Sequence, residues 1–168
     1  MTTLDQLFGA RTAELYANAV DATTAARVRE QAHFTRYALV DRGSYEHAPC
    51  DDTALLDRLV TLVSQRTGRA LTVAEARLVR LAPGDYLLAH HDRVHDDLPL
   101  ELVLDLSPAT TPGAEVHYRR RGQVYFRVPS APGTLSLVER GPTVTCNHTY
   151  VSKLHVGASV VRLIALLR

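Results

Sequence analysis

The stretch AEVHYRRRGQVYFRV, residues 114–128, has the pattern of two short strands joined by a solvated hairpin turn at Arg119-Arg120-Arg121-Gly122. Similar segments recur on both sides of it. From residue 71 onward about eight of them are separated by turn residues, among them EARLVRL, LPLELVLDL, TLSLVER and SVVRLIALL. Many short strands at this spacing are typical of a β-sandwich or barrel. We predict a mainly β fold, a double-stranded β-helix (jelly roll, cupin-like).

The N-terminal part of the chain has a different periodicity. Residues 3–31 predict one or two helices, residues 33–41 (HFTRYALVD) a strand, and residues 43–50 (GSYEHAPC) a loop. A further helix follows a cap at Asp51 or Asp52, runs through LLDRLVTLVSQRT and stops at Gly68. Its apolar stripe favours packing against a sheet. We therefore expect a single domain over residues 1–168, with 1–70 as mostly helical support packed outside a β-helix core of 71–168.

Composition limits the classes of function. A chain of 168 residues with 46% hydrophobic content can bury one sizeable core. Its formal charge of +1 provides no field that would attract nucleic acid or an anionic membrane, which favours a small-molecule or protein substrate. Cys50 and Cys146 form no CxxC pair, and we interpret them as buried reduced thiols. The N-terminus lacks the features of a secretory signal and no stretch has the ~20 apolar residues that span a bilayer, so we expect a cytoplasmic protein.

The segment PGDYLLAHHD, residues 83–92, contains the candidate metal ligands. His90 and Asp92 lie two residues apart, and a strand-like backbone points both side chains to the same face. An imidazole and a carboxylate there, with a distant second imidazole, form the facial triad that holds Fe(II) and leaves positions open for a co-substrate and O₂. A second His-x-Asp pattern, His95 and Asp97, lies in the polar stretch RVHDDLP, and we interpret it as part of a solvated loop.

The order of segments after residue 76 resembles the Fe(II)- and 2-oxoglutarate-dependent dioxygenase superfamily, particularly its prolyl-4-hydroxylase-like branch. After PGDYLLAHHD come a strand, the residues Gly113-Ala114-Glu115, a Pro132-Gly133 turn with its strand, a distal histidine, and an arginine on the last strand. Each element is degenerate alone, and the ordered set carries the resemblance. It implies a metal site of His90, Asp92 and His148, with Fe(II), 2-oxoglutarate and O₂ as cofactor and co-substrates.

Some assignments leave alternatives open. We prefer His148 to His155 as the distal ligand because it lies in a strand pattern, fourteen positions before Arg162. Arg162 sits in the apolar run SVVRLIALL, where a guanidinium needs an anionic partner. The resemblance implies the far carboxylate of 2-oxoglutarate, and the alternative is a protein carboxylate, Glu115 or Asp105. Tyr86 could supply a hydroxyl to 2-oxoglutarate or be a core or rim residue.

The sequence also departs from the family pattern. Leu81 or Ala82 stands where a tyrosine is usual before the Pro-Gly segment, Asp105 lies near the place of another tyrosine, and Ile164 replaces a common Ser or Thr. Contacts to 2-oxoglutarate beyond Arg162 are therefore left open.

The resemblance implies hydroxylation of an unactivated C–H bond, with release of succinate and CO₂. The substrate expected is a small metabolite, such as an amino acid or natural-product intermediate, or one tethered to a carrier. The alternatives are a cupin-like metalloenzyme independent of 2-oxoglutarate, which would not require Arg162, and a non-catalytic β-sandwich binding protein with incidental histidines.

Overall fold

The computed structural model describes residues 13–88, 100–140 and 144–168. The N-terminal part contains β1 (Ala13–Tyr16), α2 (Ala22–Gln31), β2 (Thr35–Leu39), β3 (Gly43–Pro49) and α3 (Thr53–Thr67). Eight more strands follow: β4 (Val73–Leu81), β5 (Tyr86–Leu87), β6 (Leu100–Asp105), β7 (Val116–Arg120), β8 (Gln123–Val128), β9 (Leu135–Glu139), β10 (Val144–His148) and β11 (Val160–Leu167). These eight confirm the strand-rich core predicted after residue 71.

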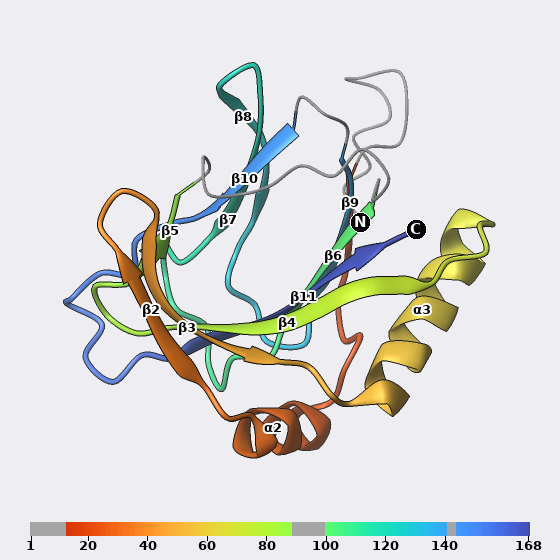
Figure 1. The fold of residues 1–168 in the computed structure, drawn as a ribbon, viewed down its shortest axis with the longest axis horizontal. Helices are drawn as coiled ribbons and strands as arrows, with labels where there is room; N and C mark the ends of the chain where they lie inside the picture. Colours follow the sequence, from red (N-terminus) through yellow and green to blue (C-terminus); the bar gives the residue numbers. More distant parts are fainter. Residues whose placement is uncertain (1–12, 89–99, 141–143) are drawn as a thin grey trace.

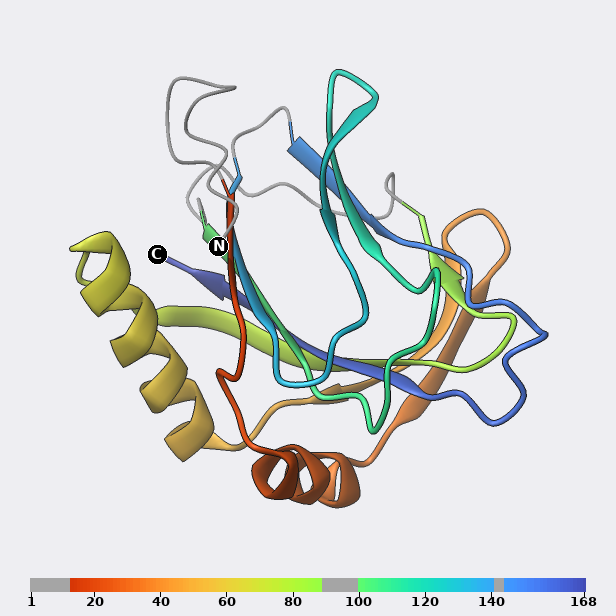
Figure 2. The same ribbon diagram turned by 180° about the vertical axis from the view of Figure 1, so that it is seen from behind.

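The strands form one antiparallel sheet that folds over on itself. Their order is β1-β9-β6-β11-β4-β3-β5-β10-β7-β8, with β2 paired to β3. In Figures 1 and 2 the wall made by β9, β6, β11 and β4 faces the wall made by β5, β10, β7 and β8, and β3 connects the two walls. Sequential strands such as β4 and β5 therefore lie in opposite walls, which is the arrangement of a jelly roll.

The helices cover the outside of the wall that contains β4 and β11 (Figure 1). Helix α3 begins where the sequence predicts, because the Asp52 carboxylate accepts a hydrogen bond from the Leu55 amide at 3.0 Å. It ends at Gly68, whose φ of 68° is readily adopted by glycine. Leu55, Leu59 and Val63 are buried. Both the helix and its packing against a sheet are thus confirmed.

Two predictions for the N-terminal part were wrong. Ala13–Tyr16, placed in a helix by the sequence pattern, is a strand paired with β9. Residues 43–49, expected to be a loop, form β3, which pairs with β2, β4 and β5. In both cases hydrogen bonds to distant segments determine the local structure. The helix predicted over 3–31 is confirmed only for Ala22–Gln31, and residues 1–12 lie outside the described residues.

Alternating side chains give each strand of the β4–β11 wall an outer and an inner face. The outer side chains pack with α2 and α3 into one apolar cluster that includes Leu78, Leu102, Leu104 and Leu163. The inner side chains form a second cluster between the walls, which includes Val79, Val103, Tyr118 and Ile164. Because the inner cluster lines the interior of the barrel, it is the place where a site can be enclosed.

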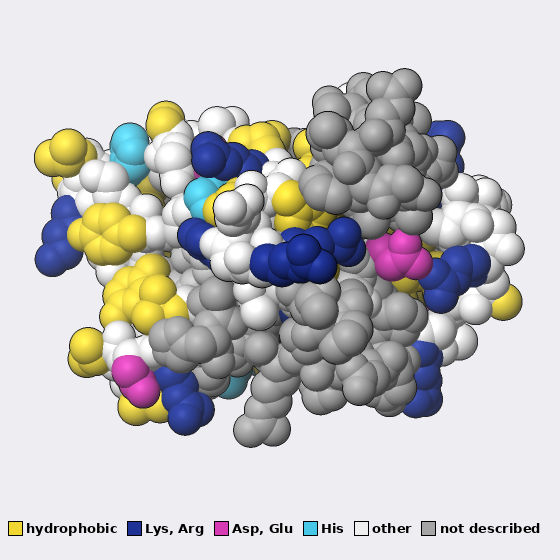
Figure 3. All heavy atoms as spheres, turned by 90° about the horizontal axis from the view of Figure 1, so that it is seen from above, with side chains coloured by type: hydrophobic (Ala, Val, Ile, Leu, Met, Phe, Trp, Pro, Cys, Tyr) yellow, Lys and Arg dark blue, Asp and Glu magenta, His cyan; other side chains and the backbone are white. Residues whose placement is uncertain are grey.

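Several smaller expectations were also tested. The predicted turn is confirmed at Arg121 and Gly122, which have φ of 53° and 77° and are exposed between β7 and β8, whereas Arg119 and Arg120 belong to β7 because they pair with β8. Figure 3 shows basic side chains gathered over this hairpin. Cys50 and Cys146 are free and buried, as predicted. No helix among the described residues has the length and apolar character needed to span a membrane.

Candidate functional site

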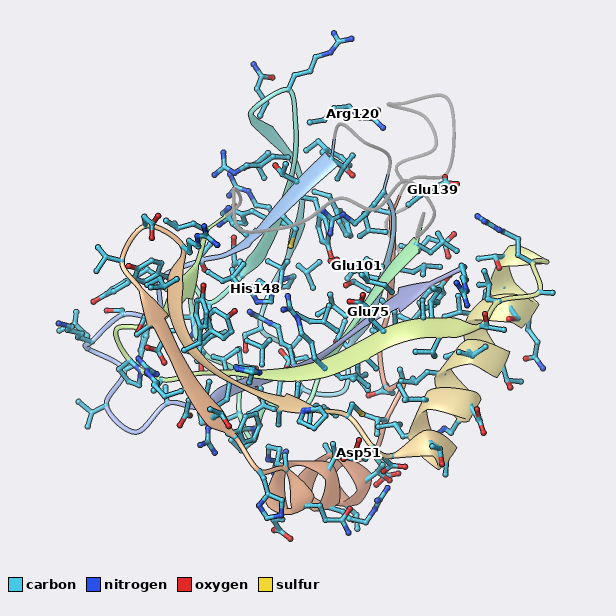
Figure 4. The ribbon with its side chains drawn as sticks, in the orientation of Figure 1. Asp51, Glu75, Glu101, Arg120, Glu139 and His148 are labelled. Carbon is cyan, nitrogen blue, oxygen red and sulfur yellow. The ribbon has the colours of Figure 1, made fainter. Side chains whose placement is uncertain are left out.

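Two polar side chains meet in the interior of the barrel. His148 ends β10 and Arg162 lies in β11, and their side chains are 2% and 1% exposed. The Nη1 atom of Arg162 lies 3.0 Å from Nδ1 of His148, and its Nη2 atom donates to the Ala114 carbonyl at 2.7 Å. A guanidinium can only donate, so Nδ1 of His148 accepts and Nε2 carries the ring proton of the neutral imidazole. Figure 4 shows His148 in the space between the two walls.

Arg162 has no carboxylate partner among the described residues. Asp105 pairs with it in the strand register, but the two Asp105 oxygens accept instead from the Ser107 and Ala131 amides, each at 2.8 Å. Oε2 of Glu115 lies 2.6 Å from Nε2 of His117. Both protein carboxylates considered as partners are thus engaged elsewhere. Burial lowers the pKa of Arg162, opposed mainly by the charge of Asp105.

His148 has the properties of a neutral ligand. Burial, and then the positive charges of Arg162 and Arg77, lower its pKa well below the ordinary value. A neutral imidazole is the form that binds a metal ion. To bind a metal through Nε2, His148 would carry its proton on Nδ1 instead, and Arg162 would then leave Nδ1 and be available to an anion.

A second polar cluster lies on the same interior face. Tyr118 donates from its hydroxyl to Oε1 of Glu101 at 2.7 Å, and Nη1 of Arg140 lies 2.6 Å from Oε2 of Glu101. All three side chains are at least 95% buried. Because the Glu101 charge is matched by Arg140, this cluster leaves the charge of Arg162 uncompensated. Glu101 is labelled in Figure 4.

No protein-family model and no curated protein sequence matches this chain. Solved structures do. A 2OG-Fe(II) oxygenase family oxidoreductase from Burkholderia pseudomallei superposes with a TM-score of 0.72 at 11% identity, over 98% of this chain and 86% of that one. A Pseudomonas putida prolyl-4-hydroxylase gives 0.69 at 16% identity, over 94% and 92%. HygX from Streptomyces hygroscopicus, with nickel and 2-oxoglutarate bound, gives 0.64 at 11% identity, over 99% and 87%.

The chain has the fold of the 2OG-Fe(II) oxygenases. The likeness extends over almost its entire length, which confirms the predicted double-stranded β-helix. It includes β1 to β3, which carry none of the motifs that suggested the resemblance.

The structure places the two candidate distal histidines in different surroundings. His148 pairs with Leu87 of β5, three residues before His90 in the sequence, and faces the interior. His155 lies in a partly exposed turn between β10 and β11, where its amide donates to Ser152 O. His90 and Asp92, and the rival pair His95 and Asp97, lie outside the described residues.

Tyr86 is not brought together with Arg162. It precedes the inward-facing Leu87 in β5, and its hydroxyl donates to the Val40 carbonyl in the β2–β3 turn at 2.9 Å. The alternation of side chains along a strand accounts for this outward direction. The hydroxyl therefore ties β5 to the neighbouring hairpin.

Two residues of the interior face were missed by sequence reasoning. Tyr45 of β3 is buried in the inner cluster, with its ring 5.0 Å from that of Tyr37. Arg77 of β4 is exposed on the same face, and its charge opposes the burial that raises the pKa of Tyr45. The alternation of Tyr45 and His47 in GSYEHAPC was the available signal for a strand, and Arg77 could be recognised only from the inward direction of Val79.

Proposed function

We propose that the protein is an Fe(II)- and 2-oxoglutarate-dependent oxygenase that hydroxylates a C–H bond of a small metabolite, such as an amino acid or natural-product intermediate. His90, Asp92 and His148 would hold the iron, and Arg162 would bind the far carboxylate of 2-oxoglutarate. With these groups bound, the iron supplies the oxidative decarboxylation of 2-oxoglutarate by O₂ to succinate and CO₂, coupled to insertion of one oxygen atom into the substrate C–H bond.

The observation that carries this proposal is the buried, unpaired charge of Arg162. A guanidinium that is 1% exposed is costly without an anion, and no carboxylate among the described residues forms an ion pair with it. Its fork geometry suits a carboxylate, which it can bind through two parallel hydrogen bonds. Its position beside His148 fits a co-substrate that reaches from a metal to a cation.

The remaining residues contribute positioning and exclusion of water. The apolar inner cluster, with Val79, Val103 and Ile164 around Arg162, keeps solvent from the guanidinium and strengthens its attraction for an anion. Asp85 holds the segment before His90, since it accepts from the Ser44 hydroxyl at 3.0 Å and the Ala82 amide at 2.9 Å and pairs with Arg36. These contacts fix the start of β5 against β3.

An anaerobic titration tests the proposal. Fe(II) and 2-oxoglutarate added to the folded protein should give the weak visible metal-to-ligand charge-transfer band. His148→Ala should lose both the band and the bound iron, whereas the matched variant His155→Ala should keep them. If the wild-type protein binds iron but gives no band, it is a metalloprotein independent of 2-oxoglutarate. If His155→Ala alone loses iron, the choice of distal ligand is wrong.

A further inference from the structure

Arg77 is the next charged residue on the face that carries the candidate site. Glu75, Arg77, Val79 and Leu81 alternate along β4, and the last two are fully buried in the inner cluster. Val79 pairs with Arg162 across the β4–β11 ladder. Arg77 is therefore the diagonal neighbour of Arg162, and such neighbours have their β-carbons about 7–8 Å apart. Unlike Arg162, Arg77 is exposed to solvent.

The Arg77 charge is not neutralised by any neighbour in the described part of the chain. It pairs in the backbone register with Ile164 of β11 and Pro49 of β3, which are both uncharged. Glu75 occupies the next inner position of the strand but forms no ion pair with Arg77. Within the described part of the chain, no carboxylate lies within salt-bridge distance of it. Its positive charge contributes to the lowered pKa of His148 and opposes the rise in the pKa of Tyr45.

Arg162 and Arg77 differ in whether the proposed co-substrate supplies an anion for them. In the proposed function, on which this inference rests, one end of 2-oxoglutarate binds the iron and the other occupies Arg162. Glu101 is already paired with Arg140, and Asp105 accepts from two amides. No anion of the bound co-substrate therefore remains for Arg77.

We propose that Arg77 binds an oxyanion of the substrate, a carboxylate or a phosphate, and so directs the substrate into the site beside His148 and Arg162. The exposed guanidinium offers two parallel N–H donors to such a group. The substrate class is therefore an organic anion, and a neutral analogue of the same shape should bind poorly.

Small aromatic probes test this without knowledge of the natural substrate. Benzoate, phenyl phosphate and neutral benzamide are titrated into anaerobic protein loaded with Fe(II) and saturating 2-oxoglutarate, followed by NMR of the arginine Nε–H groups. The anion that matches the substrate should shift the Arg77 signal and bind at least about tenfold more tightly than benzamide. Arg77→Gln should lose this preference, Arg77→Lys should keep part of it, and Arg69→Gln, which changes an exposed arginine elsewhere, should keep all of it.

The outcomes distinguish the two proposals. A preference for benzoate identifies a carboxylate, and one for phenyl phosphate a phosphate. Equal binding of benzamide, or an unchanged preference in Arg77→Gln, overturns the role of Arg77. The charge-transfer titration of Arg77→Gln with 2-oxoglutarate should match the wild type within about twofold, and a larger loss would mean that Arg77 holds the co-substrate instead. If the wild type does not bind 2-oxoglutarate, the oxygenase proposal alone is overturned. The role of Arg77 is still tested in that case, because the affinities of wild type and Arg77→Gln for benzoate, phenyl phosphate and benzamide can still be compared.

Discussion

The two faces of β11 differ sharply in chemistry. On the outer face, Val161, Leu163, Ala165 and Leu167 are buried against the helix-covered cluster. On the inner face, Arg162 stands between Val160 and Ile164 and is almost completely buried. Burial of an apolar side chain stabilises the fold, whereas burial of an unpaired guanidinium opposes it. The outer face therefore explains why the fold is stable, and on the inner face the buried charge of Arg162 lowers that stability, which fits the anion-binding role that we propose for it.

Truncation of one α3 side chain that packs on the outer face should destabilise the fold. Leu59 is 1% exposed, and Leu59→Ala should lower the free energy of unfolding by about 2–5 kcal/mol, because a cavity replaces its contacts. Urea denaturation measures the change. Leu154→Ala, at a side chain that is 89% exposed, should change it by less than about 0.5 kcal/mol. Equal effects of the two variants would contradict the assignment of the outer face to stability.

The inner face should depend on polar pairing. Tyr118→Phe removes the donor to Glu101, and should lower the free energy of unfolding by about 1–3 kcal/mol because the carboxylate is left short of a partner in the interior. Thermal or urea unfolding measures this loss. Tyr150→Phe, at a side chain that is 51% exposed, is the control and should be neutral. A neutral Tyr118→Phe would show that water reaches Glu101.

Asp85, which holds the start of β5 against β3, should make the stability of the fold depend on pH. Burial tends to raise the pKa of this carboxyl, but hydrogen bonds from Arg36, the Ala82 amide and Ser44 outweigh it and lower the pKa. Its contribution to stability is thus fully present above the unfolded value of about 3.9 and is lost as the pH falls through the lower folded value. Asp85→Asn should cost about 1–2 kcal/mol at pH 6. The difference in free energy of unfolding between wild type and Asp85→Asn, measured with urea, should shrink below about pH 4. A difference that stays constant with pH would contradict this.

The smallest effect is expected at the start of α3. Asp52→Ala removes the cap to the Leu55 amide and should lower the free energy of unfolding by about 1 kcal/mol. Asp51→Ala changes the adjacent exposed aspartate and is the matched control. Urea midpoints of the two variants measure the difference, and a larger loss in Asp51→Ala would assign the cap to the wrong residue.

The sequence predicted what local patterns encode. The capped helix, the strands after residue 71 and the inward Arg162 all follow from spacing and from an arginine in an apolar run. Strands β1 and β3 were missed because their pairing partners, β9 and β4, lie far away in the chain. Tyr45 and Arg77 were missed for the same reason, since only the register shows which face they occupy. His90 and Asp92 stay a prediction.

The proposed role of Arg162 is tested most directly by the affinity for 2-oxoglutarate after Arg162 is replaced by an uncharged residue of similar length. In anaerobic protein loaded with Fe(II), Arg162→Met should weaken 2-oxoglutarate binding by about 100-fold while bound iron stays the same, because the buried charge partner of the far carboxylate is lost. The titration follows the charge-transfer band, with Arg69→Gln, which changes an exposed arginine away from the site, as the control. Binding of 2-oxoglutarate to Arg162→Met with wild-type affinity would contradict the account.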